Sequence, residues 1–182
     1  MFRSTYLLIP FVLQILLIGI DELYFHHKRS LPKWERIGHP LDTLTVLACL
    51  GWIVVVTPTS PAVGIYVGLC IFSSIFILKD ELVHREQCES IEHWLHVVLF
   101  TLHPLVLISA GLLWPALHST EQNFPLVIYS GWERQFFLAN LTTILAFVTY
   151  QTVYWNLIWK PTQRSATAAD AQSQFRPVEG TK

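Results

Sequence analysis

Residues 80–103, DELVHREQCESIEHWLHVVLFTLH, join the polar end of one long apolar segment to the start of the next. Five of these residues fall at helical positions i, i+3, i+4, i+7 and i+14: Glu89, Glu92, His93, His96 and His103. Side chains at this spacing lie on one face of a helix. The face is made of residue types that bind metal ions, and it continues into a segment apolar enough to cross a membrane. The stretch is therefore either a metal site or a solvated, acidic helix edge.

The composition of the chain predicts an integral membrane protein. Of its 182 residues, 52% are hydrophobic and only 14% are charged, whereas about a quarter of the residues in a soluble domain are charged. The net charge is −1 and no basic stripe is present, so we expect no nucleic-acid partner. The three cysteines are isolated and indicate neither a disulfide framework nor a CxxC metal pair.

We expect an all-α fold in which residues 1–160 form five transmembrane helices and residues 161–182 form a disordered cytoplasmic tail. Pro40 then falls in the first turn of the second helix, where proline is tolerated, and Pro104 predicts a kink in the fourth helix. The predicted helices cover roughly residues 6–25, 39–57, 63–84, 91–117 and 135–159.

Basic residues gather on one side of this predicted topology, and only Arg3 and Arg134 lie on the other side. By the positive-inside rule the basic side faces the cytoplasm, which places the C-terminus inside and the N-terminus outside. The residues on the basic side are Lys28, Arg29, Lys33, Arg36, Lys79, Arg85, Lys160 and Arg164.

The chain also contains an internal repeat. The first and third helices both end in Asp-Glu-Leu followed by a histidine, at residues 21–26 and 80–84. The second and fourth helices both begin with the pattern I-x-H-x-L-[D/H], at residues 37–42 and 91–96. The chain therefore looks like two helical hairpins of one design plus a fifth helix. Each hairpin would bring Glu and His from one helix against His and Asp or His from the next.

The repeated residues predict a metal site at the cytoplasmic ends of four helices. Glu22 and His26 are four residues apart, and Glu81 and His84 are three apart, so each pair can direct two ligands to one side of a helix. Helical bundles that hold two metal ions use Glu-x-x-His pairs of this kind. Several carboxylates in an apolar setting also require compensating cations. The predicted metal ligands are Glu22, His26, His39, Asp42, Glu81, His84, Glu92, His93 and His96.

Four further residues are expected near this site. Asp21 and Asp80 are candidates to orient a ligating imidazole through a hydrogen bond. His103, two turns deeper on the same face, is either a satisfied polar group of the bundle or a contact for substrate or protons. Tyr154 would be brought to the same side by the fifth helix, although aromatic residues at this depth usually contact lipid headgroups.

The predicted architecture resembles, in broad physical design, the membrane desaturases and hydroxylases that hold two metal ions at the cytosolic ends of their helices. Those enzymes carry HxxxH and HxxHH boxes, whereas this chain has only His26-His27 and His93-x-x-His96, with many more carboxylates. The resemblance implies oxidative chemistry on a lipid or other apolar substrate. A mixed Glu, Asp and His set suits two divalent metal ions, for which we expect iron rather than zinc or manganese.

Other functions are compatible with the same residues. A metal-dependent hydrolase could use a zinc-bound water to attack a membrane lipid, with Glu or Asp as base. A metal-ion carrier or an accessory membrane subunit would bind the ion without catalysis, and His96 or His103 could bind haem. The lipid bilayer is the expected partner in each case, while the sequence indicates no particular substrate, electron donor or partner subunit.

Overall fold

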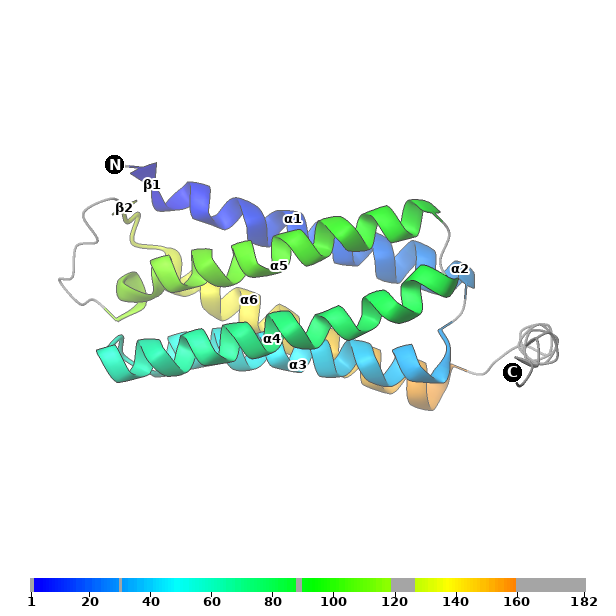
Figure 1. The fold of residues 1–182 in the computed structure, drawn as a ribbon. Coiled ribbons are helices and arrows are strands. Elements are labelled where there is room, and N and C mark those ends of the chain that lie inside the picture. The colour runs from blue at the N-terminus through cyan, green and yellow to red at the C-terminus, as the bar shows by residue number, and fades with distance from the viewer. Residues whose placement is uncertain (1, 30, 88–89, 119–126, 160–182) are drawn as a thin grey trace, which may run out of the picture.

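The computed structural model describes residues 2–29, 31–87, 90–118 and 127–159, and these residues are almost entirely helical. The long helices lie side by side along one axis, so that the N-terminal strand and the end of the last helix lie at opposite ends of the bundle (Figure 1). The predicted all-α fold class is confirmed, and the predicted tail lies outside the described residues. In chain order the elements are β1 (Phe2–Arg3), η1 (Ser4–Leu8), α1 (Ile9–Ile20), η2 (Asp21–His26), α2 (His27–Arg29), α3 (Lys33–Val55), α4 (Ser60–Gln87), α5 (Ser90–Leu117), β2 (Val127–Ile128), α6 (Glu133–Val153) and η3 (Tyr154–Ile158).

Helix α5 has the largest number of neighbours in the bundle. It packs against α1, α3, α4 and α6, while α3 packs mainly against α4 and α6. Helix α1 packs chiefly on α5 and not on α3, the helix that follows it in the chain. The first predicted hairpin is therefore not closely packed along α1, which leaves room between α1 and α3.

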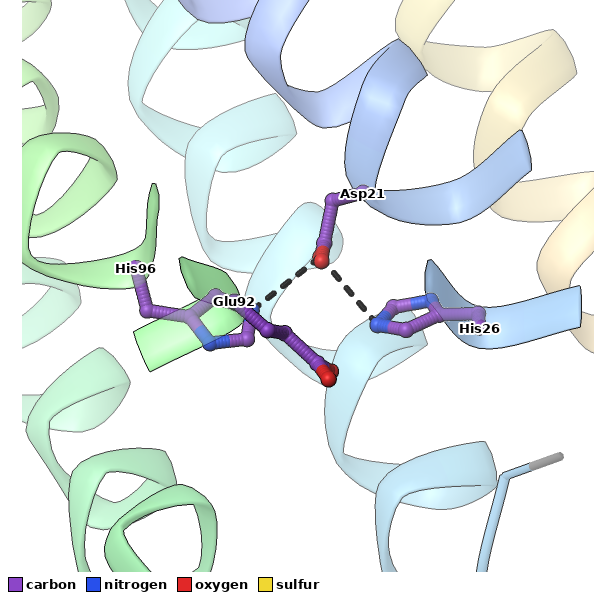
Figure 2. A group of neighbouring side chains, drawn as sticks. All are labelled: Asp21, His26, Glu92 and His96. Atoms are coloured by element: carbon purple, nitrogen blue, oxygen red, sulfur yellow. Dashed lines mark hydrogen bonds and ion pairs between the residues drawn. The ribbon is translucent and has the colours of Figure 1, made fainter. Parts of the chain in front are cut away.

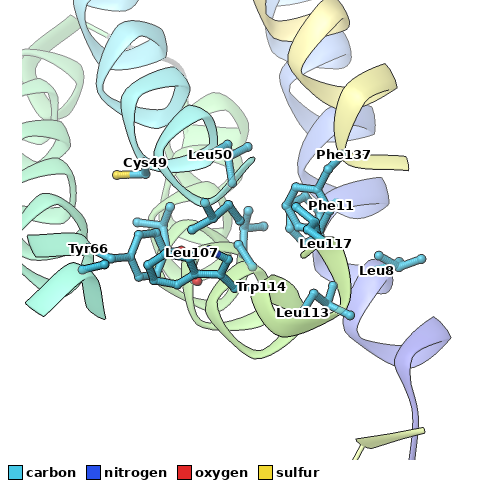
Figure 3. Close-up of a cluster of buried hydrophobic side chains, with 14 residues drawn as sticks. Leu8, Phe11, Cys49, Leu50, Tyr66, Leu107, Leu113, Trp114, Leu117 and Phe137 are labelled. Atoms are coloured by element: carbon cyan, nitrogen blue, oxygen red, sulfur yellow. The ribbon is translucent and has the colours of Figure 1, made fainter. Parts of the chain in front are cut away.

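The largest apolar core lies toward the end of the bundle that carries the N-terminus (Figure 3). Phe11 of α1 makes edge-to-face contacts with Phe136 and Phe137 of α6, at centroid distances of 5.4 and 5.6 Å. Such aromatic pairs hold the two helices together more strongly than area burial alone. Buried side chains from all five long helices join this core: Leu8, Phe11, Cys49, Leu50, Tyr66, Leu107, Leu113, Trp114, Leu117 and Phe137.

Helices α4 and α5 approach closely at Gly111. A Cβ atom at this position would lie 3.1 Å from the ring of Tyr66. The Tyr66 hydroxyl donates a hydrogen bond of 2.6 Å to the carbonyl oxygen of Leu107 on α5. Small residues at helix interfaces permit this close approach, which brings the backbones within reach of side-chain hydrogen bonds.

The start of the second long helix corrects the sequence prediction. Helix α3 begins at Lys33 and not at His39-Pro40, because Pro32 is extended (φ −63°, ψ 157°) and starts the helix at the following residue. Pro40 therefore lies inside the helix, where it cannot donate to the carbonyl of Arg36. Asn156 donates to this carbonyl instead, at 3.1 Å, so the helix continues. Glu35 consequently becomes a helical residue one turn before His39.

Five of the described helical segments are long and apolar enough to cross a membrane: Ser4–His26, Lys33–Val55, Ser60–Lys79, Ser90–Leu117 and Glu133–Ile158. Their outer surfaces carry many exposed large apolar side chains, of which Val55 (80% exposed) and Leu157 (75% exposed) are examples. Monomeric soluble proteins rarely expose large contiguous apolar patches. These features are consistent with a multi-pass membrane protein.

Candidate metal centre

The C-terminal end of α1 winds into a π-helical turn, η2, that positions three ionisable side chains. In a regular α-helix Asp21 and His26, five residues apart, would point about 140° away from each other. The i→i+5 winding of a π-turn brings such residues together, and single π-turns are common at functional sites. As a result Asp21, Glu22 and His26 are all buried at the polar end of the bundle.

Four buried side chains from two helices converge at this end: Asp21 and His26 from η2, and Glu92 and His96 from α5 (Figure 2). One ligand atom from each lies within 4.8 Å of all the others. Because metal–oxygen and metal–nitrogen bonds are about 2.0–2.2 Å long, two ligands on opposite sides of one ion lie up to about 4.4 Å apart. The four side chains are therefore close enough together to bind one ion after a small adjustment of their positions. We call them the Asp21 group.

The hydrogen bonds of His26 indicate that a positive charge belongs inside the Asp21 group. The ionised carboxylate of Glu22 can only accept, so His26 donates to it from Nδ1 at 3.0 Å. In a neutral ring Nε2 then presents a lone pair, yet it lies 3.1 Å from Oδ2 of Asp21, without hydrogen-bond geometry. Two acceptors this close require either a proton on Nε2 or a metal ion that both atoms bind.

Asp21 is a buried carboxylate whose described partners are two histidines. Its Oδ2 atom lies 3.1 Å from Nε2 of His26 and 3.2 Å from Nε2 of His96. Its Oδ1 atom is buried and has no hydrogen-bond partner among the described residues. No described Lys or Arg contacts Asp21 or Glu22. Burying carboxylates in this way is costly unless cations compensate their charge, which either a protonated His26 or a divalent metal ion would do.

A second group of three potential ligands shares His26 and adds Glu35 and His39 from α3. The rings of His26 and His39 stack with centroids 4.8 Å apart, and Glu35 Oε2 lies 3.8 Å from His39 Nε2. We call these three residues the Glu35 group. Glu35 is absent from the ligands predicted from the sequence because it precedes residue 39, the predicted start of the second helix. Its signal is the spacing Glu-x-x-x-His, which also occurs at Glu92 and His96.

Glu22, a predicted ligand, orients other residues in this geometry. Besides the bond from His26, it accepts a hydrogen bond from the indole Nε1 of Trp155, which is 1% exposed. A carboxylate that holds the far nitrogen of a ligating histidine fixes its tautomer and raises its basicity. In this geometry Asp21 belongs to the candidate metal group and Glu22 does not, whereas the sequence predicts Glu22 as a ligand and Asp21 as an orienting residue.

Of the other predicted residues, Asp42, His93, His103 and Tyr154 lie outside both groups. The carboxylate of Asp42 forms an ion pair with Lys79, and His93 is partly exposed on α5. Tyr154 is at the same end of the bundle, as expected, where its ring stacks on that of Tyr150 at 5.3 Å. His103 is buried two turns below His96. The side chains of Asp80, Glu81 and His84 lie outside the described part of the structure, so their predicted roles stay predictions.

A cavity of about 470 Å³ adjoins the Asp21 group, between α1, α3, α5 and α6. Its size is within the range of about 300–1,000 Å³ that is usual for small-molecule sites. Asp21, His26 and His96 form part of its wall. Most of the remaining wall is apolar and includes Phe11, Ile15, Leu50, Leu99, Ile144 and Phe147.

Comparison with protein-family models, curated proteins and solved structures finds no match to this chain.

Proposed function

We propose that the chain is an integral membrane metalloenzyme that oxidises a lipid or another apolar molecule bound in the cavity. The observation that carries this proposal is the position of Asp21, His26 and His96. These three side chains belong both to the candidate metal group and to the wall of an apolar cavity. A molecule in the cavity would therefore place a hydrocarbon segment directly beside the ion.

The Asp21 group would hold one divalent ion. A second ion would take only Glu35 and His39 from the Glu35 group, because His26 Nε2 would bind the first ion and its Nδ1 donates to Glu22. Carboxylate and imidazole ligands without thiolates suit iron, manganese or zinc, and we favour iron. A bound iron ion would supply the ability to activate dioxygen. The protein side chains would bind and orient the ion, balance its charge and keep water from the apolar wall. Trp155 and Glu22 would hold His26 in the required tautomer.

Hydroxylation is the simplest reaction that fits these parts. One atom of dioxygen would enter a C–H bond of the substrate, and the other would leave as water. The reaction takes up two protons and two electrons, which a reduced electron-carrier protein would supply. A desaturation would use the same oxidant and the same two electrons but would release two molecules of water.

Hydrolysis and ion transport fit the site less well. Hydrolysis needs a polarised carbonyl or phosphoryl group beside the metal, whereas the surface of the cavity as a whole is mainly apolar. An ion pathway needs polar groups along its length. The surface of the cavity is mostly hydrocarbon, although Gln14, Thr43 and Asn140 also line it. A small oxidisable molecule suits this lining better than a passing ion.

The position in the membrane also belongs to this proposal. We infer that the metal end of the bundle faces the cytoplasm, because Lys28, Lys33, Arg36 and Lys79 lie at that end. We also infer that α1–α3 and α4–α5 arose as a repeat. In this repeat Glu35 would be equivalent to Glu92, and His39 to His96. The sequence pattern instead aligns His39 with His93, so the two alignments differ by three residues.

Reconstitution with iron tests the proposed chemistry. The protein, purified in lipid nanodiscs and loaded with Fe(II) without oxygen, is expected to develop a visible absorption change when dioxygen is admitted. The His96→Leu variant should bind less iron and lose the change, whereas Thr101→Ala, on the exposed face of the same helix, should behave as wild type. A colourless protein that retains only zinc would favour the hydrolase. A protein that binds none of these metals would overturn the proposal.

A further inference from the structure

Three polar side chains form a hydrogen-bonded row at the side of the cavity, deeper in the bundle than the metal groups. The Thr45 hydroxyl donates to the carbonyl oxygen of Asp42 at 2.8 Å and lies 2.7 Å from Ser73 Oγ. Ser73 Oγ in turn lies 3.0 Å from Nε2 of His103. These residues come from α3, α4 and α5, and Ser73 and His103 are buried.

The row fixes the tautomer of His103. Each hydroxyl carries one hydrogen. Since Thr45 donates to a backbone carbonyl, Ser73 must donate to Thr45, and Ser73 Oγ then accepts from His103. This is the only assignment in which all three bonds form. Nε2 of His103 therefore carries the ring hydrogen, and Nδ1 of the neutral ring is a hydrogen-bond acceptor.

The Nδ1 atom is available to a ligand in the cavity. His103 lines the cavity, and its only hydrogen bond within the described residues is the one from Nε2 to Ser73. No described carboxylate contacts the ring, so nothing there favours a charged imidazolium in this apolar setting. The residue lies seven positions after His96 on α5, which corresponds to about 10 Å along the helix axis.

We propose that His103 Nδ1 accepts a hydrogen bond from a hydroxyl group on an otherwise apolar ligand. The ligand would be an aliphatic alcohol or a hydroxylated lipid. The next step rests on the proposed oxidative function. Because His103 lies roughly 10 Å along the helix axis from His96, the carbon that reacts would lie roughly 10 Å from this hydroxyl. His103 would thus select the substrate and set which carbon meets the metal, while Ser73 and Thr45 hold its ring.

Ligand binding tests the proposal without any turnover. Tritiated dodecan-1-ol is bound to the purified protein in nanodiscs, with empty nanodiscs as background, and is displaced by unlabelled dodecan-1-ol or by its methyl ether. The ether has the same chain and an oxygen but no O–H. Wild type is expected to prefer the alcohol about tenfold, the size of one buried hydrogen bond between neutral groups. Equal affinity for the two competitors would overturn the proposal.

Variants separate the hydrogen bond from packing. His103→Leu should bind both competitors alike, and His103→Asn, whose side-chain oxygen can take the place of Nδ1, should keep part of the preference. Ser73→Ala should reduce the preference, because the ring can then carry its hydrogen on Nδ1. Ser109→Ala, a buried serine of α5 outside the row, is the control and should match wild type. A preference that survives in His103→Leu would contradict the assignment.

The metal content of the same samples keeps the two proposals apart. Alcohol selectivity in a protein that binds no metal would contradict the oxidative function alone. Stoichiometric metal in a protein without alcohol selectivity would contradict the role of His103 alone.

Discussion

Replacing Asp21 by asparagine should remove most of the metal from the protein. Oδ2 of Asp21 lies 3.1 Å from Nε2 of His26 and 3.2 Å from Nε2 of His96, in the middle of the candidate group. Asparagine keeps the size of the side chain but loses its charge and one acceptor oxygen. Removing the partner of a ligand costs about 10- to 100-fold in metal affinity, so removing a direct charged ligand should cost at least about 100-fold.

The neighbouring carboxylate provides a matched comparison. Glu22→Gln also removes one buried negative charge, but in this structure Glu22 holds Nδ1 of His26 and accepts from Trp155. An orienting role predicts a loss of about 10- to 100-fold in affinity, smaller than that of Asp21→Asn. The sequence alone predicts the reverse order, with Glu22 as a ligand and Asp21 as a residue that orients a ligating imidazole.

The assay is a titration of metal-free protein with Fe(II) under anaerobic conditions, with bound iron determined by elemental analysis after gel filtration. Circular dichroism and resistance to thermal unfolding confirm that each variant is folded. If Asp21→Asn binds iron as tightly as wild type while Glu22→Gln does not, the assignment of the group is refuted.

Further variants separate the site from the scaffold. Glu35→Gln should lower the amount of iron bound per chain. Glu133→Gln removes a buried carboxylate that accepts hydrogen bonds from backbone amides at the opposite end of the bundle, so it should leave the bound iron unchanged and cost about 1 kcal/mol of stability. Elemental analysis and thermal unfolding measure both outcomes. Trp155→Phe should weaken iron binding about tenfold, because its hydrogen bond to a buried carboxylate is lost, and the same titration measures it. Gly111→Leu should lower the free energy of unfolding by about 1–3 kcal/mol, because the new side chain meets the ring of Tyr66; unchanged denaturation in sodium dodecyl sulfate would contradict this packing.

The number and type of the long helices could be predicted from the sequence. Apolar segments of about 20 residues are a strong signal, because a helix of that length matches the hydrocarbon core of a bilayer. The helix from Ser90 to Leu117 begins one residue from its predicted start. Glu92, His96 and His103 are buried on one face of that helix, as the spacing predicts.

The boundaries were harder where helices extend beyond their apolar part. The basic segment before His39 has the composition of a loop, but it continues α3 to Lys33 because Asn156, distant in the sequence, satisfies the carbonyl of Arg36. Glu35 lies in this extension and is therefore absent from the ligands that the sequence predicts. A contact between segments 120 positions apart leaves no signal in local composition.

The roles of Asp21 and Glu22 depend on the π-turn. Helical spacing places Glu22 and His26 on one face and directs Asp21 elsewhere. The turn from Asp21 to His26 changes this direction, and sequence spacing based on a regular α-helix does not show it. The cavity is likewise a tertiary feature, since α1 packs on α5 and leaves space beside α3.

Anomalous diffraction from crystals of the iron-loaded protein, recorded at the iron absorption edge, tests the central claim most directly. The account predicts a peak bounded by Asp21, His26, Glu92 and His96, next to the apolar cavity, that disappears in crystals of Asp21→Asn. Crystals of iron-loaded protein with no peak among these four residues would contradict it.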